Sequence, residues 1–128
     1  MAKIKQPSLP TDIVMDKIFL RDLRLNAIIE TYPEERVTKQ DIILNVELRC
    51  DLRKAGRSDC LHDTVNYVDI EQRIIRHVEN SNFHLIEALA ESVADICLET
   101  EGVASAKVTL DKPHALQSVR SVAVEIER

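Results

Sequence analysis

The sequence predicts an α+β domain in which an antiparallel sheet carries two helices on one face. Four segments alternate apolar and polar residues with the period of a half-buried strand. Between the second and the third of them, two adjacent segments repeat apolar residues with the period of a helix. The resulting order is ββααββ, a helix pair flanked by two hairpins, and we expect both helices to cover the same face of the sheet.

The first two predicted strands are separated by a charged loop. Residues 17–29 alternate, but the apolar positions change parity near Arg21 and Asp22, which predicts a β-bulge there. Residues 30–38 contain a proline and several charges and predict a loop. Every second residue of 42–50 is apolar, which predicts a long half-buried strand.

The first helix follows a polar connection. Residues 54–63 contain turn-forming Gly and Asp and predict a turn rather than a regular element. An apolar stripe at helical spacing then follows, with an aromatic residue at its start: Tyr67, Ile70, Ile74 and Val78.

The second helix is predicted to open at Phe83, after a break at residues 80–82, and to run to about Thr100, with Gly102 as its C-cap. On a helical wheel of about 100° per residue, its apolar face comprises Leu85, Ile86, Leu89, Val93 and Ile96. Its polar face comprises Glu87, Glu91 and Asp95.

The chain is predicted to close with two more strands, at residues 104–110 and 122–126, joined by a turn in which Pro113 stops the first of them. Residues 1–15 show no period and predict a flexible extension, so that residues 16–128 form a single domain. The two free edges of a four-stranded sheet favour self-association.

Composition restricts the classes of partner. Hydrophobic residues make up 45% of the 128 residues and aromatics only 3%, so the core must be aliphatic. A net charge of −5 argues against nucleic acid and anionic membranes, which need clustered cations. Cys50, Cys60 and Cys97 show neither a disulfide framework nor zinc spacing, so we expect reduced thiols in a cytoplasmic protein. No apolar run approaches the ~18 residues of a membrane span.

The sequence lacks the motifs that several kinds of functional site require. The two glycines, Gly56 and Gly102, form no phosphate-binding loop. The four histidines are scattered, and His84 with Glu87 would supply at most two ligands where a catalytic zinc takes three, so no metal is expected. No nucleophile motif is present. Acid, base and hydrogen-bond chemistry remain.

A few residues suit that chemistry, although each has a plainer interpretation. The first turn of a helix favours the charged form of Glu87, which could accept two parallel N–H bonds from a planar ligand edge or simply face solvent. Lys112 ends a strand and could donate a proton, form an imine or only aid solubility. Tyr67 could be a core or interface aromatic, and Glu34 and Glu35 solvated loop charges.

Four stretches in this order resemble the dihydroneopterin aldolase family and the closely related dihydroneopterin triphosphate epimerases. They are Asp63-Thr64-Val65-Asn66-Tyr67, Leu85-Ile86-Glu87-Ala88-Leu89-Ala90-Glu91, Asp111-Lys112-Pro113-His114-Ala115-Leu116 and Ser121-Val122-Ala123-Val124-Glu125-Ile126. The resemblance covers about residues 16–127.

The resemblance implies the tunnelling fold (T-fold), in which subunits join edge to edge into a ring around a β-barrel. It implies a homo-tetramer, or a homo-octamer of two stacked rings, with a pterin pocket at each subunit boundary. The implied reaction is retro-aldol cleavage of 7,8-dihydroneopterin into 6-hydroxymethyl-7,8-dihydropterin and glycolaldehyde, a step of folate synthesis. It needs no metal or organic cofactor, because the ring imine of the pterin accepts the electrons.

The resemblance also assigns roles to residues. The catalytic group comprises Lys112, Tyr67 from a neighbouring subunit and Glu35. The pterin-binding group comprises Glu87, Ile86, Val65 and Thr64. Glu30 stands where the family usually has a glycine, so the choice between Glu34 and Glu35 as the loop acid stays open.

Two other activities remain open. Asn45-Val46 and the stretches at residues 77–80 and 111–116 are as similar to epimerases as to aldolases, and Arg120 is a candidate for contacting a triphosphate. A non-catalytic ring-forming pterin binder is the third possibility.

Overall fold

The computed structural model of the chain describes residues 15–29 and 39–128. The predicted N-terminal extension therefore lies outside the described residues, except for Met15. The strands are β1 (Asp16–Ile29), β2 (Gln40–Cys50), β3 (Asn82–Phe83), β4 (Ser105–Pro113) and β5 (Ser121–Glu127). The helices are α1 (Arg53–Ser58), the 3-10 turn η2 (Leu61–Asp63), α2 (Tyr67–Glu79) and α3 (Ile86–Leu98). In the described residues no helix is long and apolar enough to span a membrane.

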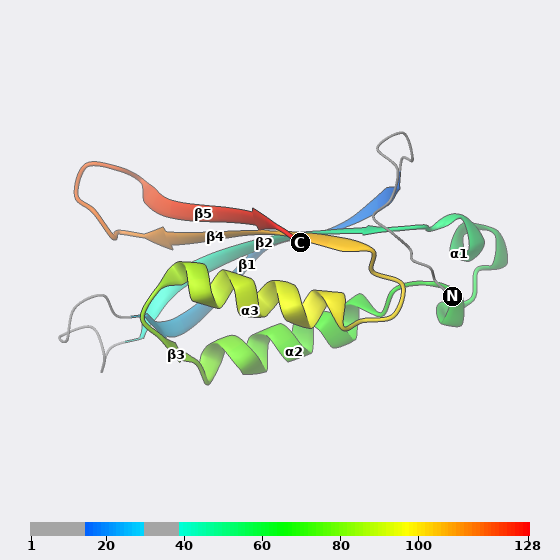
Figure 1. Cartoon of the computed structure of the whole chain (residues 1–128), viewed down its shortest axis with the longest axis horizontal. Coiled ribbons are helices and arrows are strands. Elements are labelled where there is room, and N and C mark those ends of the chain that lie inside the picture. The colour runs from blue at the N-terminus through cyan, green and yellow to red at the C-terminus, as the bar shows by residue number, and fades with distance from the viewer. Residues whose placement is uncertain (1–14, 30–38) are drawn as a thin grey trace.

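These strands form one sheet in the order β3-β1-β2-β4-β5, and α2 and α3 lie side by side against one of its faces (Figure 1). The α+β class and the two helices on one face are therefore as predicted. The pairs β1–β2, β2–β4 and β4–β5 are antiparallel.

The predicted bulge lies where the parity of β1 changes. The register between β1 and β2 shifts between Leu20 and Leu23, and Asp22 has a φ of 55°. The Asp22 N–H donates to Asn45 Oδ1 at 2.9 Å, so a side chain of β2 replaces the backbone partner that the bulge removes.

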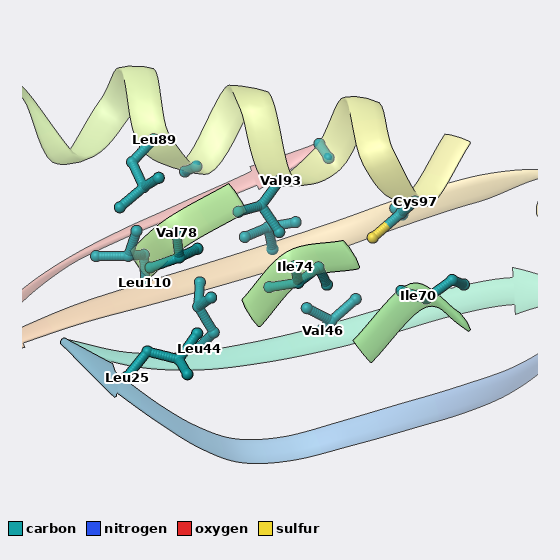
Figure 2. Close-up of a cluster of buried hydrophobic side chains, with 14 of the residues drawn as sticks. Leu25, Leu44, Val46, Ile70, Ile74, Val78, Leu89, Val93, Cys97 and Leu110 are labelled. Atoms are coloured by element: carbon teal, nitrogen blue, oxygen red, sulfur yellow. The ribbon is translucent and has the colours of Figure 1, made fainter. Parts of the chain in front are cut away.

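The core is aliphatic and lies between the sheet and the helix pair (Figure 2). In β2, alternate residues from Ile42 to Cys50 are at most 2% exposed. The predicted stripe of α2 is fully buried at Ile70, Ile74 and Val78, and α3 buries Leu89, Ala90, Val93, Ala94 and Cys97. Periodicity identified the buried stripe of α2, because burial on one side of an element imposes the period. In α3 it identified Leu89 and Val93 but missed Ala90, Ala94 and Cys97, and the predicted Ile86 and Ile96 are only partly buried.

The starts of both helices differ from prediction. Tyr67 is 48% exposed and does not join the buried stripe of α2. α3 begins at Ile86 rather than Phe83, and Leu85, predicted on the apolar face, is its 51% exposed N-cap.

The predicted antiparallel sheet of four strands is wrong in one respect. Part of the predicted break between the helices forms β3, in which Asn82 and Phe83 pair parallel with Ile28 and Ile29. The sheet is therefore mixed. A strand of two residues is too short to show alternation, so the sequence carries no signal for it.

The connection at residues 54–63 is also more regular than predicted. Arg53–Ser58 forms a helical turn and a half, and Asp59 ends it in the left-handed conformation with a φ of 57°. The turn signal of Asp59 was therefore real, but it ends a short helix.

The predicted C-cap of α3 is wrong: Glu99, not Gly102, caps the helix, and Gly102 follows in the next turn with a φ of 93°. β4 ends at Pro113, as predicted, but it runs past the predicted residue 110 and pairs Pro113 with Ser121. A missing N–H is tolerated at a strand end.

Candidate functional site

β4 places Lys112 on the face of the sheet that the helices cover. Ala106, Val108 and Leu110 are fully buried on that face, and the alternation puts Lys112 next in the same row. Its side chain is 7% exposed, and it is the one buried charged residue of the described chain. A solubilising lysine would not be buried, because an ammonium group loses hydration there.

The start of α3 places Ile86 and Glu87. Leu85 has no side chain that can cap the helix, so Glu87 is the group that complements the free first-turn N–H groups. Glu87 is exposed and Ile86 is half-buried. The pairing of β3 with β1 fixes the entry to this turn, because Phe83 lies opposite Ile29.

Lys112 and Glu87 belong to the same end of the molecule. β4 follows α3 after a short connection and runs back along it, so the last residues of β4 lie at the end where α3 begins (Figure 1). We call Lys112, Ile86 and Glu87 the lysine end.

Thr64, Val65 and Tyr67 lie at the start of α2 and are called the tyrosine end. Asn66 caps the helix, because its side-chain Oδ1 accepts a hydrogen bond from the Asp69 N–H at 3.0 Å. Val65 is 3% exposed and its carbonyl accepts from the Tyr67 N–H at 3.0 Å. The cap and the buried valine therefore fix the backbone of Tyr67 at the start of α2, while its side chain is exposed.

The two ends are separated by the length of the helix pair. α2 and α3 have 13 residues each, which is about 20 Å at the rise of an α-helix. They run in opposite directions, so the start of α2 lies at the end of α3 (Figure 1). One chain thus brings Lys112, Ile86 and Glu87 to one end, and it brings Thr64, Val65 and Tyr67 to the opposite end. Glu35, like Glu30 and Glu34, lies outside the described residues.

Sequence reasoning missed a cavity of about 450 Å³ at the tyrosine end. Thr64, Val65 and Gly102 line it, together with charged residues from four separate segments. Lys54 Nζ lies 3.3 Å from Asp63 Oδ1, and hydrogen bonds from Ser58 and then Lys54 lower the pKa of Asp63. No local sequence pattern could have indicated this cavity, because the segments that line it come together only in the fold.

Metal-binding side chains do not converge in residues 15–29 and 39–128: no three His, Cys, Asp or Glu side chains are placed to hold an ion there. Arg120 is exposed and directly precedes β5. The connection that carries it leaves β4 just after Lys112, at the lysine end (Figure 1).

A family model and individual known sequences match this chain, and they point to the same family. The family model described as dihydroneopterin aldolase (FolB) matches residues 18–127. The folic acid synthesis protein FOL1 of Dictyostelium discoideum is 41% identical over 114 residues, and these are 89% of this chain but 17% of that protein. The dihydroneopterin triphosphate 2'-epimerase of Escherichia coli K12 is 38% identical over 109 residues, covering 85% of this chain and 91% of that enzyme. The dihydroneopterin aldolase of the same strain is 34% identical over 114 residues, covering 89% and 93%.

Solved structures agree with these sequences. The E. coli dihydroneopterin aldolase in complex with neopterin superposes with a TM-score of 0.82 at 33% identity, covering 89% of this chain and 99% of that one. A Burkholderia dihydroneopterin aldolase bound to guanine has a TM-score of 0.77 at 25% identity, covering 89% and 90%.

Proposed function

The chain belongs to the dihydroneopterin aldolase family, and we propose that it cleaves 7,8-dihydroneopterin into 6-hydroxymethyl-7,8-dihydropterin and glycolaldehyde in the cytoplasmic synthesis of folate. The observation that carries the proposal is Lys112: a buried lysine on the helix-covered face, at the end where Glu87 begins α3. In this proposal Lys112 is the proton donor and Glu87 the anion, and one ligand at the lysine end would contact both.

The pterin would be held by the Glu87 carboxylate. The aminopyrimidinone edge of a pterin presents two parallel N–H groups, which match the two oxygens of a carboxylate. Guanine and neopterin share this edge, and each is bound in a solved structure of a relative. The backbone at Ile86, Val65 and Thr64 would add hydrogen bonds to the same ring.

The reaction needs protons moved at two places. Deprotonation of the 2'-hydroxyl forms the aldehyde as the C1'–C2' bond breaks, and the bonding electrons enter the ring imine at N5. Transfer of a proton from N5 to C1' then completes the hydroxymethyl product. Lys112, acting through a water molecule, would move these protons, while Tyr67 and Glu35 orient the hydroxyl group.

A complete site requires a second copy of the chain, because Tyr67 lies about 20 Å from the lysine end, one helix length away. Among the described residues β5 pairs only with β4, and β1 has an open edge except at Ile28 and Ile29. Pairing of β5 with β1 of the next copy would build a ring in which the tyrosine end of one subunit meets the lysine end of another. We infer a homo-tetrameric ring, or a homo-octamer of two rings.

Epimerisation of dihydroneopterin triphosphate is the second candidate. The 38% identity to an epimerase and the exposed Arg120 at the lysine end favour it, since a triphosphate needs a cation at the rim of its pocket. A pterin-binding ring without turnover is the third.

Product analysis separates the three. Purified protein is incubated with 7,8-dihydroneopterin and, separately, with its triphosphate. We expect glycolaldehyde from the first substrate. An altered side-chain stereocentre on the triphosphate would instead identify an epimerase, and binding without either product a pterin binder.

Two variants test the residue roles in the same assay. Lys112→Ala should lower kcat by about 10²–10⁴-fold with little change in KM, whereas Lys107→Ala, on the opposite face of β4, should leave both unchanged. Glu87→Ala should weaken pterin binding by about 2–5 kcal/mol. Its control is Asp95→Ala, on the exposed face of the same helix. Full turnover in Lys112→Ala, or tight binding by Glu87→Ala, would contradict these roles.

A further inference from the structure

We propose that His77 is a positioning residue for the pterin anchor: it bonds α2 to α3 and contacts β3, and so fixes the first turns of α3 that present Glu87. The proposal rests on the proposed function in taking Glu87 as the anchor. His77 lies in the last turn of α2 and is half-buried.

The donor in the hydrogen bond between His77 and Ser92 can be identified, because the Ser92 hydroxyl group has only one hydrogen. His77 Nε2 lies 2.8 Å from Ser92 Oγ, and Ser92 Oγ donates its single hydrogen to the Leu89 carbonyl at 2.7 Å. Ser92 can therefore only accept from the ring, so His77 Nε2 carries a hydrogen and donates it. A chain of two hydrogen bonds thus runs from α2 through Ser92 to the backbone of α3.

The same ring reaches the segment before α3. The centroids of His77 and Phe83 are 6.0 Å apart, and their planes are tilted by 56°, a favourable arrangement for two aromatic rings. Phe83 lies in β3, four residues before Glu87, and Ser92 lies in α3, five residues after it. His77 therefore holds the chain on both sides of the carboxylate.

Ile86 packs against the core, but the hydrogen bonds described at the start of α3 are few. Leu85 provides no side-chain cap, β3 is only two residues long, and the Leu89 N–H to Leu85 carbonyl bond is long at 3.3 Å. An uncapped helix start frays readily. Loss of the His77 contacts should therefore loosen the turn around Glu87 more than it affects Lys112, which lies on β4.

The test compares three substitutions at one position. His77→Ala removes both contacts, and His77→Phe keeps a ring but removes the donor. His77→Gln keeps an N–H donor at the distance of Nε2. Arg76→Ala, one residue earlier with an exposed side chain, is the control.

Neopterin affinity, KM and kcat are measured for folded protein. We expect His77→Ala and His77→Phe to raise Kd and KM about fivefold, equivalent to one neutral hydrogen bond, with kcat within twofold of wild type. His77→Gln and Arg76→Ala should match wild type. A purely structural role would lower the melting temperature without separating KM from kcat or being rescued by Gln.

Amide hydrogen exchange at Leu89 provides a second measurement that does not depend on catalysis. Exchange should accelerate in His77→Ala and return to the wild-type rate in His77→Gln. Unchanged exchange and affinity in His77→Ala, or no rescue by Gln, would overturn the positioning role. If wild type itself bound no neopterin, the proposed function would fail, while the exchange rates would still decide whether His77 holds the turn.

Discussion

Replacing Gly102 by alanine tests whether the turn after α3 requires glycine. Gly102 has a φ of +93°, and a Cβ added there would lie 3.2 Å from Val65 Cγ2. A backbone in this region strains any residue that carries a Cβ, and the close contact adds to that strain. We expect Gly102→Ala to lower the free energy of unfolding by about 2 kcal/mol.

Gly56 is the matched control, because it is the only other glycine in the chain. It lies inside α1, and an added Cβ would meet nothing within 4 Å. Alanine is favoured over glycine in a helix by about 1 kcal/mol, so Gly56→Ala should raise stability slightly. The same added methyl group should therefore act in opposite directions at the two positions.

The assay is thermal unfolding monitored by circular dichroism. Protein concentration must be fixed, because assembly makes the midpoint depend on it. For a chain of this length, a loss of 2 kcal/mol corresponds to a fall in Tm of roughly 7 °C. A Tm for Gly102→Ala equal to or above that of wild type would refute the strain at Gly102 and its contact with Val65.

Three further predictions follow from local chemistry. Asn66→Ala should lower the free energy of unfolding by about 1 kcal/mol, measured by thermal unfolding, whereas Asn66→Asp should keep the cap and leave that free energy unchanged. Hydrogen bonds from the side chain and backbone of Arg53 lower the pKa of Asp51 from 3.8 to about 2. The ionised Asp51 therefore stabilises the folded state fully above pH 4, and this stabilisation is lost as the pH falls from about 4 to about 2. Arg53→Ala should move the Asp51 titration seen by NMR back towards 3.8, and an unmoved titration would disprove the assignment. Burial raises the pKa of the Cys97 thiol to about 11, so at pH 8 a thiol reagent should modify exposed Cys60 first, and Cys60→Ser should lose that fast phase.

Much of the fold could be predicted from local pattern. Alternation identified four strands and the bulge at Asp22, and the stripe from Ile70 to Val78 identified the buried face of α2. Each of these features repeats within one element, so neighbouring residues report it directly. The two-residue strand β3 and the short helix α1 were missed because neither is long enough to establish a period.

The candidate site likewise has features that the sequence indicated and features that only the fold showed. The residues at the start of α3 and at the end of β4 were found from sequence, and alternation alone indicates that Lys112 shares a face with Leu110. Periodicity does not tell whether a lysine at a strand end is solvated. The fold supplied that answer, because Lys112 is only 7% exposed.

The sequence by itself therefore determined where the main helices and strands lie and many of their buried positions, and it suggested the side chains that we propose for the site. Only the tertiary structure decided that β3 joins the sheet in parallel and that Lys112 is buried. It also decided that Tyr67 and Glu87 lie at opposite ends of one chain. The reason is that periodicity records the environment along one element, whereas these features depend on contacts between residues far apart in the chain.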